Sequence, residues 1–504
     1  MKKYEDFEKE AASYQLILQR YKKTGVLYED PNFHPKRKIK ENKVKFDGRD
    51  IVWNRVDKYF KSPLYENISK DAVQQGELGD CYFISTLSRI GKQKELVKLL
   101  FDPISDVKCG AVIVYFYAYG RRTPILIDTL LPFKLGTRTP IFSHPSDITY
   151  SAWFTLVEKA FAKLNGSYSN IVCGQFAHAV YSLFGYHPFS KTIENIKGNP
   201  FDKLMKYQRI GALIGTSIHS TTKASQEEIQ KNGLVQNHSY LVLKARTVEG
   251  KNFLCLRNPW GNDREWLGDW SDTSELWTPS LKKALSVKFG NDGSFWMIDK
   301  DFFKYFTDLE VSKPVNPRWH CRSFHTQLKP GPHDGRQYTD PGSKMAQRDT
   351  YVFRIDSDEA IKIYIRCEKR ASPDYESSKL QILLCNTKGQ KITPEIIPYS
   401  SRQTFTTSNE IAGFSKMIEK PKEEGWTIVI LRTTAMKIVE DVYVQLYCEK
   451  DFTLYNVDTP NVLIPEDEKT GILFDNSSVL HPNVAPTLKT IPINGKDVQV
   501  LSSL

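Results

Sequence analysis

The chain has 504 residues, of which 40% are hydrophobic, enough to bury cores in about three domains. Its 70 basic residues exceed its 59 acidic ones and give a formal net charge of +11, but they are dispersed and form no nucleic-acid module, so no nucleic-acid partner is expected. The N-terminus lacks a signal-peptide core, and no run reaches the ~18 apolar residues of a membrane span, so we expect a cytoplasmic protein. The cysteines show no CxxC spacing, so we expect reduced thiols.

The first predicted element is an N-terminal helix over residues 1–25, because apolar residues recur there at helical spacing. Residues 26–44 are polar and basic, which is typical of a linker, so 1–44 is interpreted as a helix with a linker. A first lobe is expected at 45–185. Its predicted elements are an opening strand at Val52–Trp53, strands at 111–116 and 124–128, and a helix from Trp153 to Lys163.

Within this lobe, the segment Gln75–Ile84 combines a turn with the start of a helix. Gly76, Gly79 and Asp80 favour the turn, and apolar residues at helical spacing follow them. With Asp80 as the N-cap, Cys81 falls in the first helical turn, where unpaired amides and the helix dipole favour a thiolate. Cys81 is therefore a candidate nucleophile. The alternative is that it is one more small, buried hydrophobic residue.

A second lobe is expected at 186–312 and is rich in strands. One strand-like run opens at His238, and the next ends at Asn258. A loop around Glu249–Gly250 would join the two as antiparallel neighbours and bring the histidine beside the asparagine. A thiolate nucleophile needs a histidine and a group that orients it, so this pair is the candidate partner of the cysteine. Three further histidines could act as bases on composition alone, but no strand ending in Asn-Pro-Trp follows them: His178, His187 and His219.

Several separated motifs resemble the protease core of the calpain family and occur in the family's order over residues 45–310. They are Gln75–Cys81, Trp153, Glu158–Tyr168, the His238 strand, Arg257–Gly261 with Glu265–Trp266 and Trp270–Asp272, and Asp292–Met297. The resemblance implies an α+β fold whose papain-like core has two lobes. Nucleophile and base would then come from different lobes, with the active site in the cleft between them.

The resemblance also implies a role for each matched residue. Cys81 would be the nucleophile, His238 the general base and then acid, and Asn258 the group that orients the imidazole. Gln75 would contribute to the oxyanion hole together with the Cys81 amide, and Trp260 would shield the histidine and asparagine from water. The implied activity is limited proteolysis of protein substrates by an intracellular cysteine endopeptidase.

Two positions depart from the usual calpain pattern. Tyr82 follows the cysteine where the family has tryptophan, and Asn237 precedes the histidine where the family has glycine. Tyrosine keeps an aromatic ring, and asparagine tolerates a positive φ better than most residues. Neither change removes a catalytic group.

The calcium ligands are the largest departure, since each lobe of a calpain core binds one calcium ion. The matching first-lobe positions are Ala72 and Ser151, which supply no charged oxygen. Glu265, Asp272 and Asp292 match ligand positions in the second lobe. The resemblance therefore implies weakened calcium binding, in the second lobe only, because calcium needs about six to eight oxygens. Otherwise these carboxylates would be surface capping and ion-pairing residues.

Regular short strands over residues 313–450 indicate an antiparallel β-sandwich, which resembles the domain that follows calpain cores. The basic residues Lys369, Arg370 and Lys379 would let this domain bind anionic membrane lipid. The extension at 451–504 contains prolines, little periodicity and no EF-hand pattern, so no EF-hand small subunit is expected. The alternative function is a catalytically silent scaffold, or a lipid- or protein-binding protein that acts through the sandwich.

Overall fold

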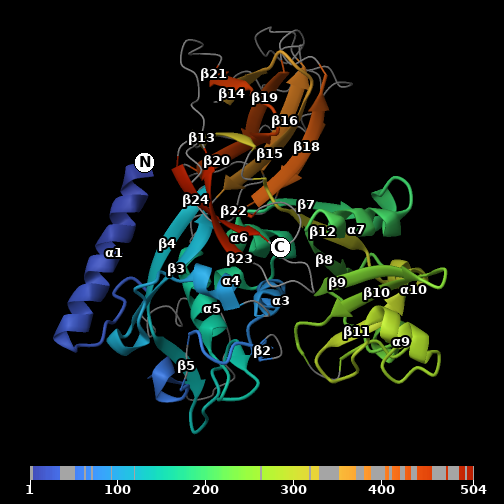
Figure 1. Ribbon diagram of the computed structural model, residues 1–504, viewed down its shortest axis with the longest axis horizontal. Coiled ribbons are helices and arrows are strands. Elements are labelled where there is room, and N and C mark those ends of the chain that lie inside the picture. Colours follow the sequence, from blue (N-terminus) through green and yellow to red (C-terminus); the bar gives the residue numbers. More distant parts are fainter. Residues whose placement is uncertain are drawn as a thin grey trace.

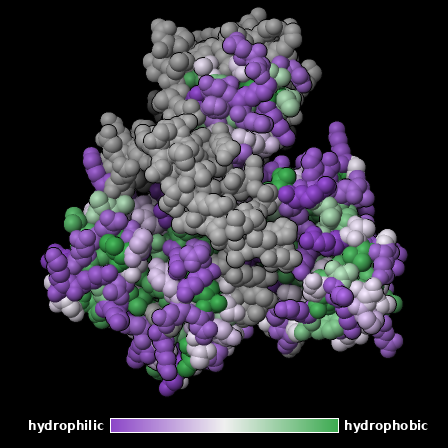
Figure 2. Space-filling model, in the orientation of Figure 1, coloured by the Kyte–Doolittle hydropathy of each residue, from purple (hydrophilic) through white to green (hydrophobic). Residues whose placement is uncertain are grey.

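The structure is a computed structural model. It describes residues 4–33, 51–316 apart from 62–63, 70–71, 92–93, 119 and 262–263, then 319–328, 351–369, 380–386, 403–407, 411–419, 426–432, 440–456, 473–474, 487–493 and 496–502. As predicted, helices and sheets are mixed (Figure 1). The large clusters of buried hydrophobic residues are called here the first, second and third cores. The first spans residues 33–186 and also includes Leu213 and Leu241, the second spans 193–311, and the third spans 324–454. Hydrophilic side chains dominate the described part of the face in Figure 2.

The first core is mainly helical. Its central helix, α3, has every residue after its first one buried, and Phe83 of α3 stacks on Phe161 of α5 with ring centroids 4.0 Å apart. Strand pairs β1–β5, β2–β6 and β3–β4 are antiparallel. The elements of this part are α1 (Tyr4–Thr24), β1 (Ile51–Arg55), β2 (Val73–Gln74), α3 (Cys81–Ile90), α4 (Lys94–Leu100), β3 (Ala111–Ala118), β4 (Arg121–Asp128), β5 (Leu130–Lys134), β6 (His144–Pro145), α5 (Trp153–Leu164) and α6 (Phe176–Phe184).

The segment that follows α1 is not the solvated linker that its polar composition predicted. Tyr28 is buried, and Asp30 is fully buried. Lys163 pairs with Asp30 at 2.6 Å, and the Asp30 amide donates to Asp128 at 2.9 Å. Each buried charge therefore has a partner, which is the condition for burying it at all. Phe33 belongs to the first core, whereas Tyr28 packs in a smaller cluster with Leu18 of α1 and with β3 and β4. Residues 34–50 lie outside the described residues.

The second core surrounds a six-stranded antiparallel sheet with the order β11-β10-β9-β8-β12-β7. Strands β9 and β10 are joined by Glu249 and Gly250, which have φ values of 50° and 71° as a two-residue hairpin turn requires. This is the predicted hairpin. The elements are β7 (His187–Thr192), α7 (Pro200–Arg209), β8 (Leu213–Ile218), α8 (Gln226–Lys231), β9 (His238–Val248), β10 (Lys251–Arg257), α9 (Pro279–Leu285), β11 (Ser294–Ile298), α10 (Asp299–Tyr305) and β12 (Asp308–Lys313).

The third core lies between two antiparallel sheets, ordered β13-β20-β15-β18 and β17-β16-β19-β14-β21. Strand β21 pairs with β14, so residues 453–456 belong to this unit although we expected it to end at 450. The C-terminal extension forms a further sheet, β22-β24-β23, which its low periodicity did not predict. The strands are β13 (His320–Leu328), β14 (Tyr351–Asp356), β15 (Ile361–Lys369), β16 (Leu380–Asn386), β17 (Gln403–Thr407), β18 (Ile411–Ile418), β19 (Trp426–Arg432), β20 (Glu440–Cys448), β21 (Thr453–Asn456), β22 (Leu473–Phe474), β23 (Thr487–Ile493) and β24 (Lys496–Ser502).

Candidate active site

Cys81 is the first residue of α3, as the sequence predicted, and its side chain is half-buried. The turn before it needs glycine, because a Cβ at Gly76 would lie 2.1 Å from the carbonyl oxygen of Phe142. Asp80 occupies the N-cap position, but its carboxyl accepts no capping hydrogen bond. Helix α3 packs against α6 and also against β9, which belongs to the sheet of the second core. The two cores therefore meet at this helix.

His238 and Asn258 lie side by side at the ends of β9 and β10. The Nε2 atom of His238 is 2.8 Å from Oδ1 of Asn258, and both side chains are buried. Two backbone groups fix the amide of Asn258, because its Nδ2 donates to the carbonyl of Arg264 at 2.9 Å and its Oδ1 accepts from the amide of Trp260 at 3.1 Å. The oxygen therefore faces the histidine.

This geometry fixes the tautomer of His238. A carbonyl oxygen only accepts hydrogen bonds, so Nε2 must carry the hydrogen that it donates to Asn258. In the neutral imidazole, Nδ1 is then free of hydrogen and can accept a proton. The ring of Trp260 covers the histidine, with the ring centroids 4.6 Å apart.

The backbone amide of Ser239, the residue after His238 on β9, hydrogen-bonds to the sulfur of Cys81. Burial nevertheless raises the pKa of this thiol to about 11, and the Ser239 amide offsets only part of the effect. Burial also lowers the pKa of His238 to about 4, against a smaller opposing effect of Asn258. The thiolate that we expected from the helix N-terminus is therefore not the favoured form. Removal from water outweighs the helix dipole, and both groups are neutral near pH 7.

Gln75 lies in the turn before α3. Its Nε2 donates to the carbonyl of Leu78 at 2.7 Å, while its buried Oε1 accepts no hydrogen bond from the described residues. A primary amide has two N–H hydrogens, so one remains for another acceptor.

Comparison with known proteins identifies the family. Residues 28–313, more than half of the chain, match the family described as "Calpain family cysteine protease". The chain belongs to the calpain family. Calpain clp-4 of Caenorhabditis elegans is 32% identical over 57% of this chain and 41% of its own length, and a Schistosoma mansoni calpain is 32% identical over 59% and 41%. Human calpain-14 is 30% identical over 60% of this chain and 45% of its own length. The chain thus spans less than half the length of these calpains.

Both departures from the usual calpain pattern fit their surroundings. Asn237 has a φ of 54°, a left-handed conformation that suits glycine and that asparagine tolerates. Tyr82 is buried, and a Cβ at Gly174 would lie 2.4 Å from its ring, so the glycine makes room for the ring.

The expected calpain calcium ligands bind backbone amides in this structure. Glu265 accepts from Gly293 at 2.7 Å, Asp272 from Gly290 at 3.0 Å, and Asp292 from Ser294 at 2.9 Å. Burial raises the pKa of Asp272, and the charge of Asp292 adds to that effect. Across the described residues, no three histidine, cysteine or acidic side chains converge on a point that could hold a metal ion.

The first-lobe positions of the calpain calcium ligands are buried and hold no charge. Ala72 is 1% exposed, and the Ser151 hydroxyl donates to the carbonyl of Leu64 at 2.9 Å.

Two of the alternative histidines make contacts outside the candidate active site. His219 bonds to Asp308 at 2.7 Å, and His187 packs against Tyr364 with ring centroids 5.4 Å apart.

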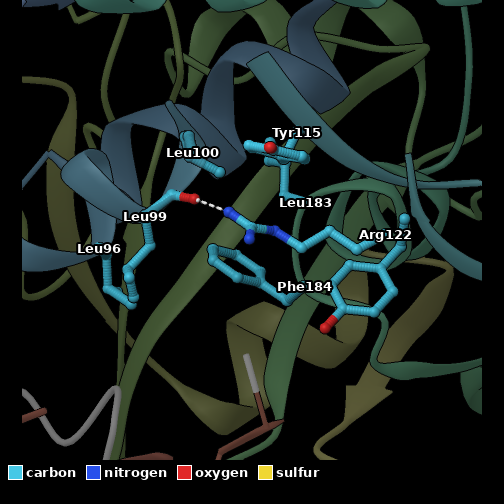
Figure 3. A pocket seen from close by; sticks show the side chains of 8 residues that line it. Leu96, Leu99, Leu100, Tyr115, Arg122, Leu183 and Phe184 are labelled. Atoms are coloured by element: carbon cyan, nitrogen blue, oxygen red, sulfur yellow. Dashed lines mark hydrogen bonds between the residues drawn. The ribbon is translucent and has the colours of Figure 1, made fainter. Parts of the chain in front are cut away.

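A small pocket lies on the first core (Figure 3). Arg122 reaches into it, donates to the carbonyl of Leu99 at 2.7 Å and stacks 3.8 Å over the ring of Tyr115. No candidate active-site residue lines this pocket, so it has no assigned part in the chemistry. Its lining residues are Leu96, Leu99, Leu100, Tyr115, Tyr117, Arg122, Leu183 and Phe184.

In the described part of the chain, no helix combines the length and hydrophobicity that crossing a membrane requires.

Sequence reasoning missed two features of this site. One is the Ser239 amide at the sulfur of Cys81, which no sequence pattern marks. The other is a contact between Asp80 and Glu158, two carboxyl groups that are 0% and 1% exposed. The sequence does contain a signal for the contact between Asp80 and Glu158. Glu158 lies among apolar residues of a helix whose other positions are predicted to be buried, and an acidic residue there needs a partner.

Proposed function

We propose that this calpain-family chain is a cysteine endopeptidase that cuts protein substrates through Cys81, His238 and Asn258. The observation that supports it most is the 2.8 Å contact between His238 and Asn258, with the neighbouring Ser239 amide at the Cys81 sulfur. The nucleophile comes from the first core and the base from the second. The active site would then be the junction of two lobes, at 45–185 and 186–312.

In the proposed reaction, Nδ1 of His238 accepts the thiol proton as the Cys81 sulfur attacks the substrate carbonyl carbon. The resulting imidazolium then protonates the leaving amine, and the acyl enzyme is hydrolysed by water that the same nitrogen activates. Asn258 holds the ring by accepting from Nε2, and Trp260 keeps water away from that hydrogen bond. The remaining amide hydrogen of Gln75 and the backbone amide of Cys81 would stabilise the oxyanion.

The neutral thiol and imidazole indicate a resting form of the enzyme. Transferring the proton from Cys81 to His238 is unfavourable while their pKa values are about 11 and about 4. Activation would therefore require a rearrangement at the junction of the lobes that admits water or substrate and brings the two values closer.

Calcium is the family's regulator, and its positive charge would draw carboxylates together when bound. We assign Glu265, Asp272 and Asp292 as its candidate ligands, in the second lobe only. Because these side chains do not converge here, no step of the proposed mechanism depends on calcium.

The two sheets around the third core support a calpain-type β-sandwich as the domain after the protease core, ending near residue 456. The proposed lipid contact through Lys369, Arg370 and Lys379 concerns side chains outside the described residues. Cytoplasmic location and independence from an EF-hand small subunit remain proposals. The alternative of a silent scaffold is favoured only by the raised pKa of the Cys81 thiol.

The test is casein or fluorogenic-peptide cleavage by the full chain and by Cys81→Ser. We expect cleavage by the wild type and none by Cys81→Ser or His238→Ala, whereas Asn258→Ala should keep partial activity because an orienting group contributes less. Cys173→Ser is the matched control, since Cys173 is an exposed thiol, and it should cleave like the wild type. Unchanged cleavage by Cys81→Ser would disprove the proposal.

A further inference from the structure

Asp80, the residue before Cys81, has a carboxyl group in an unusual state. The residue is 0% exposed, and its carboxyl oxygens receive no hydrogen bond from another residue among those described, so the backbone amide of Asp80 itself is the one donor that acts on them. Among the described residues, no lysine, arginine or histidine acts on it electrostatically. A carboxylate in such a place would be a buried charge without a partner, which proteins avoid by keeping the group protonated.

The group that contacts Asp80 is the carboxyl of Glu158, from the buried face of α5. Glu158 accepts two hydrogen bonds from Ser143, at 3.1 Å from its amide and 2.9 Å from its hydroxyl. Two carboxylates facing each other would offer only acceptors. A single proton between them turns the contact into a hydrogen bond, and the donors of Ser143 then favour the negative charge on Glu158.

The titration behaviour of the pair agrees with this geometry. Burial raises the pKa of Asp80 far above its ordinary range, and Glu158 adds to that effect. Burial raises the pKa of Glu158 to about 7, whereas Ser143 and Asp80 lower it. The other titratable groups that face the pair are Tyr168, which follows α5 and whose own pKa is raised by burial, and Cys81 itself.

We propose that Asp80 and Glu158 share one proton, which Asp80 carries, and that Glu158 is thereby a positioning residue that keeps negative charge off the residue next to the nucleophile. The inference rests on the proposed role of Cys81. An ionised Asp80 would oppose formation of the Cys81 thiolate, because a negative charge on the adjacent residue disfavours a second one. The charge on Glu158 lies farther from Cys81 than a charge on Asp80 would, and the amide and hydroxyl of Ser143 stabilise it by hydrogen bonding.

The decisive comparison is between two substitutions of Asp80 and one of Glu158. Asp80→Ala removes the donor to Glu158 and should lower the rate of Cys81 alkylation. Asparagine can donate to Glu158 as protonated Asp80 does, so Asp80→Asn should keep most of the wild-type rate. In Glu158→Gln, the glutamine oxygen would accept from Ser143 and its NH₂ group would donate to Asp80, which moves the negative charge onto Asp80. The pH at which Cys81 reacts should then rise by about one unit or more.

The measurement is the pH dependence of Cys81 alkylation by iodoacetamide, on the full chain in a Cys173→Ser background so that the exposed thiol does not react. Alkylation does not require proteolysis, so it tests the inference even if peptide cleavage fails. Loss in Asp80→Asn equal to that in Asp80→Ala would show that the charge of Asp80 is needed and would overturn the proposal. So would a Glu158→Gln profile that matches the unsubstituted background.

An infrared measurement keeps the proposal testable if the variants fold poorly. The wild type should show the band of a buried protonated carboxylic acid at pH 8, where ordinary aspartates and glutamates are ionised. The band should be weaker in Asp80→Asn, where the buried Glu310, whose pKa burial raises to about 8, still contributes to it. It should keep its full intensity in the matched control Asp147→Asn, because Asp147 is a solvent-exposed carboxyl with a lowered pKa. A band of equal intensity in the wild type and in Asp80→Asn would also overturn the proposal.

Discussion

The phenol of Tyr181 on α6 donates a 2.6 Å hydrogen bond to the carboxyl of Glu368 on β15. Helix α6 contributes to the first core and β15 to the third, and both residues are buried. Glu368 also accepts from the amide of Gly120 at 3.1 Å, and Gln445 on β20 donates to the carbonyl of Gly120 at 2.6 Å. The sheet of the third core is therefore tied to the first core by hydrogen bonds from the buried side chains of Tyr181, Glu368 and Gln445.

Arg366 extends this network to the joint between the first two cores. Its guanidinium donates to the carbonyls of Gly185 and Tyr186, which lie between α6 and β7, and to Gln445. We expect Arg366→Ala to lower the free energy of unfolding by about 3 kcal/mol, because it leaves buried acceptors without a donor. Chemical denaturation measures this. The matched control is Lys362→Ala, an exposed cation on the same strand, and equal losses in both variants would contradict the prediction.

Acid should destabilise the protein through His238. Its pKa is about 4 in the folded chain and about 6.5 when unfolded, so between these values only the unfolded state binds a proton. The stability that the neutral imidazole contributes is fully present above pH 6.5 and is lost as the pH falls to about 4. Over this range the free energy of unfolding should decrease by roughly 3 kcal/mol. The difference in unfolding free energy between wild type and His238→Gln isolates this effect from other groups. A difference that does not change with pH would refute it.

Asp30 should matter for stability far more than an exposed acidic residue does. Asp30→Asn leaves the largely buried ammonium of Lys163 without its counter-charge, which should cost about 3 kcal/mol. Glu95→Gln breaks an exposed pair with Lys98 at 2.9 Å and should cost less than about 1 kcal/mol. Thermal unfolding of both variants measures the two costs, and similar melting temperatures would show that the segment after α1 is not anchored through this pair.

The sequence predicted those parts of the site that depend on local pattern. Alternating strands and a Glu-Gly turn were enough to place His238 beside Asn258, and a glycine-rich turn placed Cys81 at a helix start. The pKa of the Cys81 thiol depends instead on how deeply the junction of two cores buries it, which no local pattern encodes. For the same reason Asp30 was predicted to lie in a linker: its polar neighbours in sequence conceal buried partners that lie far along the chain.

Calcium should bind this chain weakly and at one site. The three candidate carboxylates belong to Glu265, Asp272 and Asp292, and each already accepts a backbone amide, whereas calcium requires about six to eight oxygens. We expect calorimetry on the full chain to give a dissociation constant of about 10⁻⁴ to 10⁻³ M. Affinity should fall further in acid, because the raised pKa of Asp272 lets protons compete with the ion.

Substitutions on one loop test this assignment of the calcium site. Asp272→Asn should abolish the calorimetric signal and any stimulation of cleavage by calcium, because it removes one of the few charged oxygens available. Asp269→Asn is the matched control, since Asp269 is an exposed carboxylate three residues earlier, and it should bind calcium like the wild type. Ala72 and Ser151 offer the ion no charged oxygen in the first lobe. Calcium can therefore shift the closure of the lobes only through the second lobe. Two tight sites, or one that survives Asp272→Asn, would show that the ligands lie elsewhere.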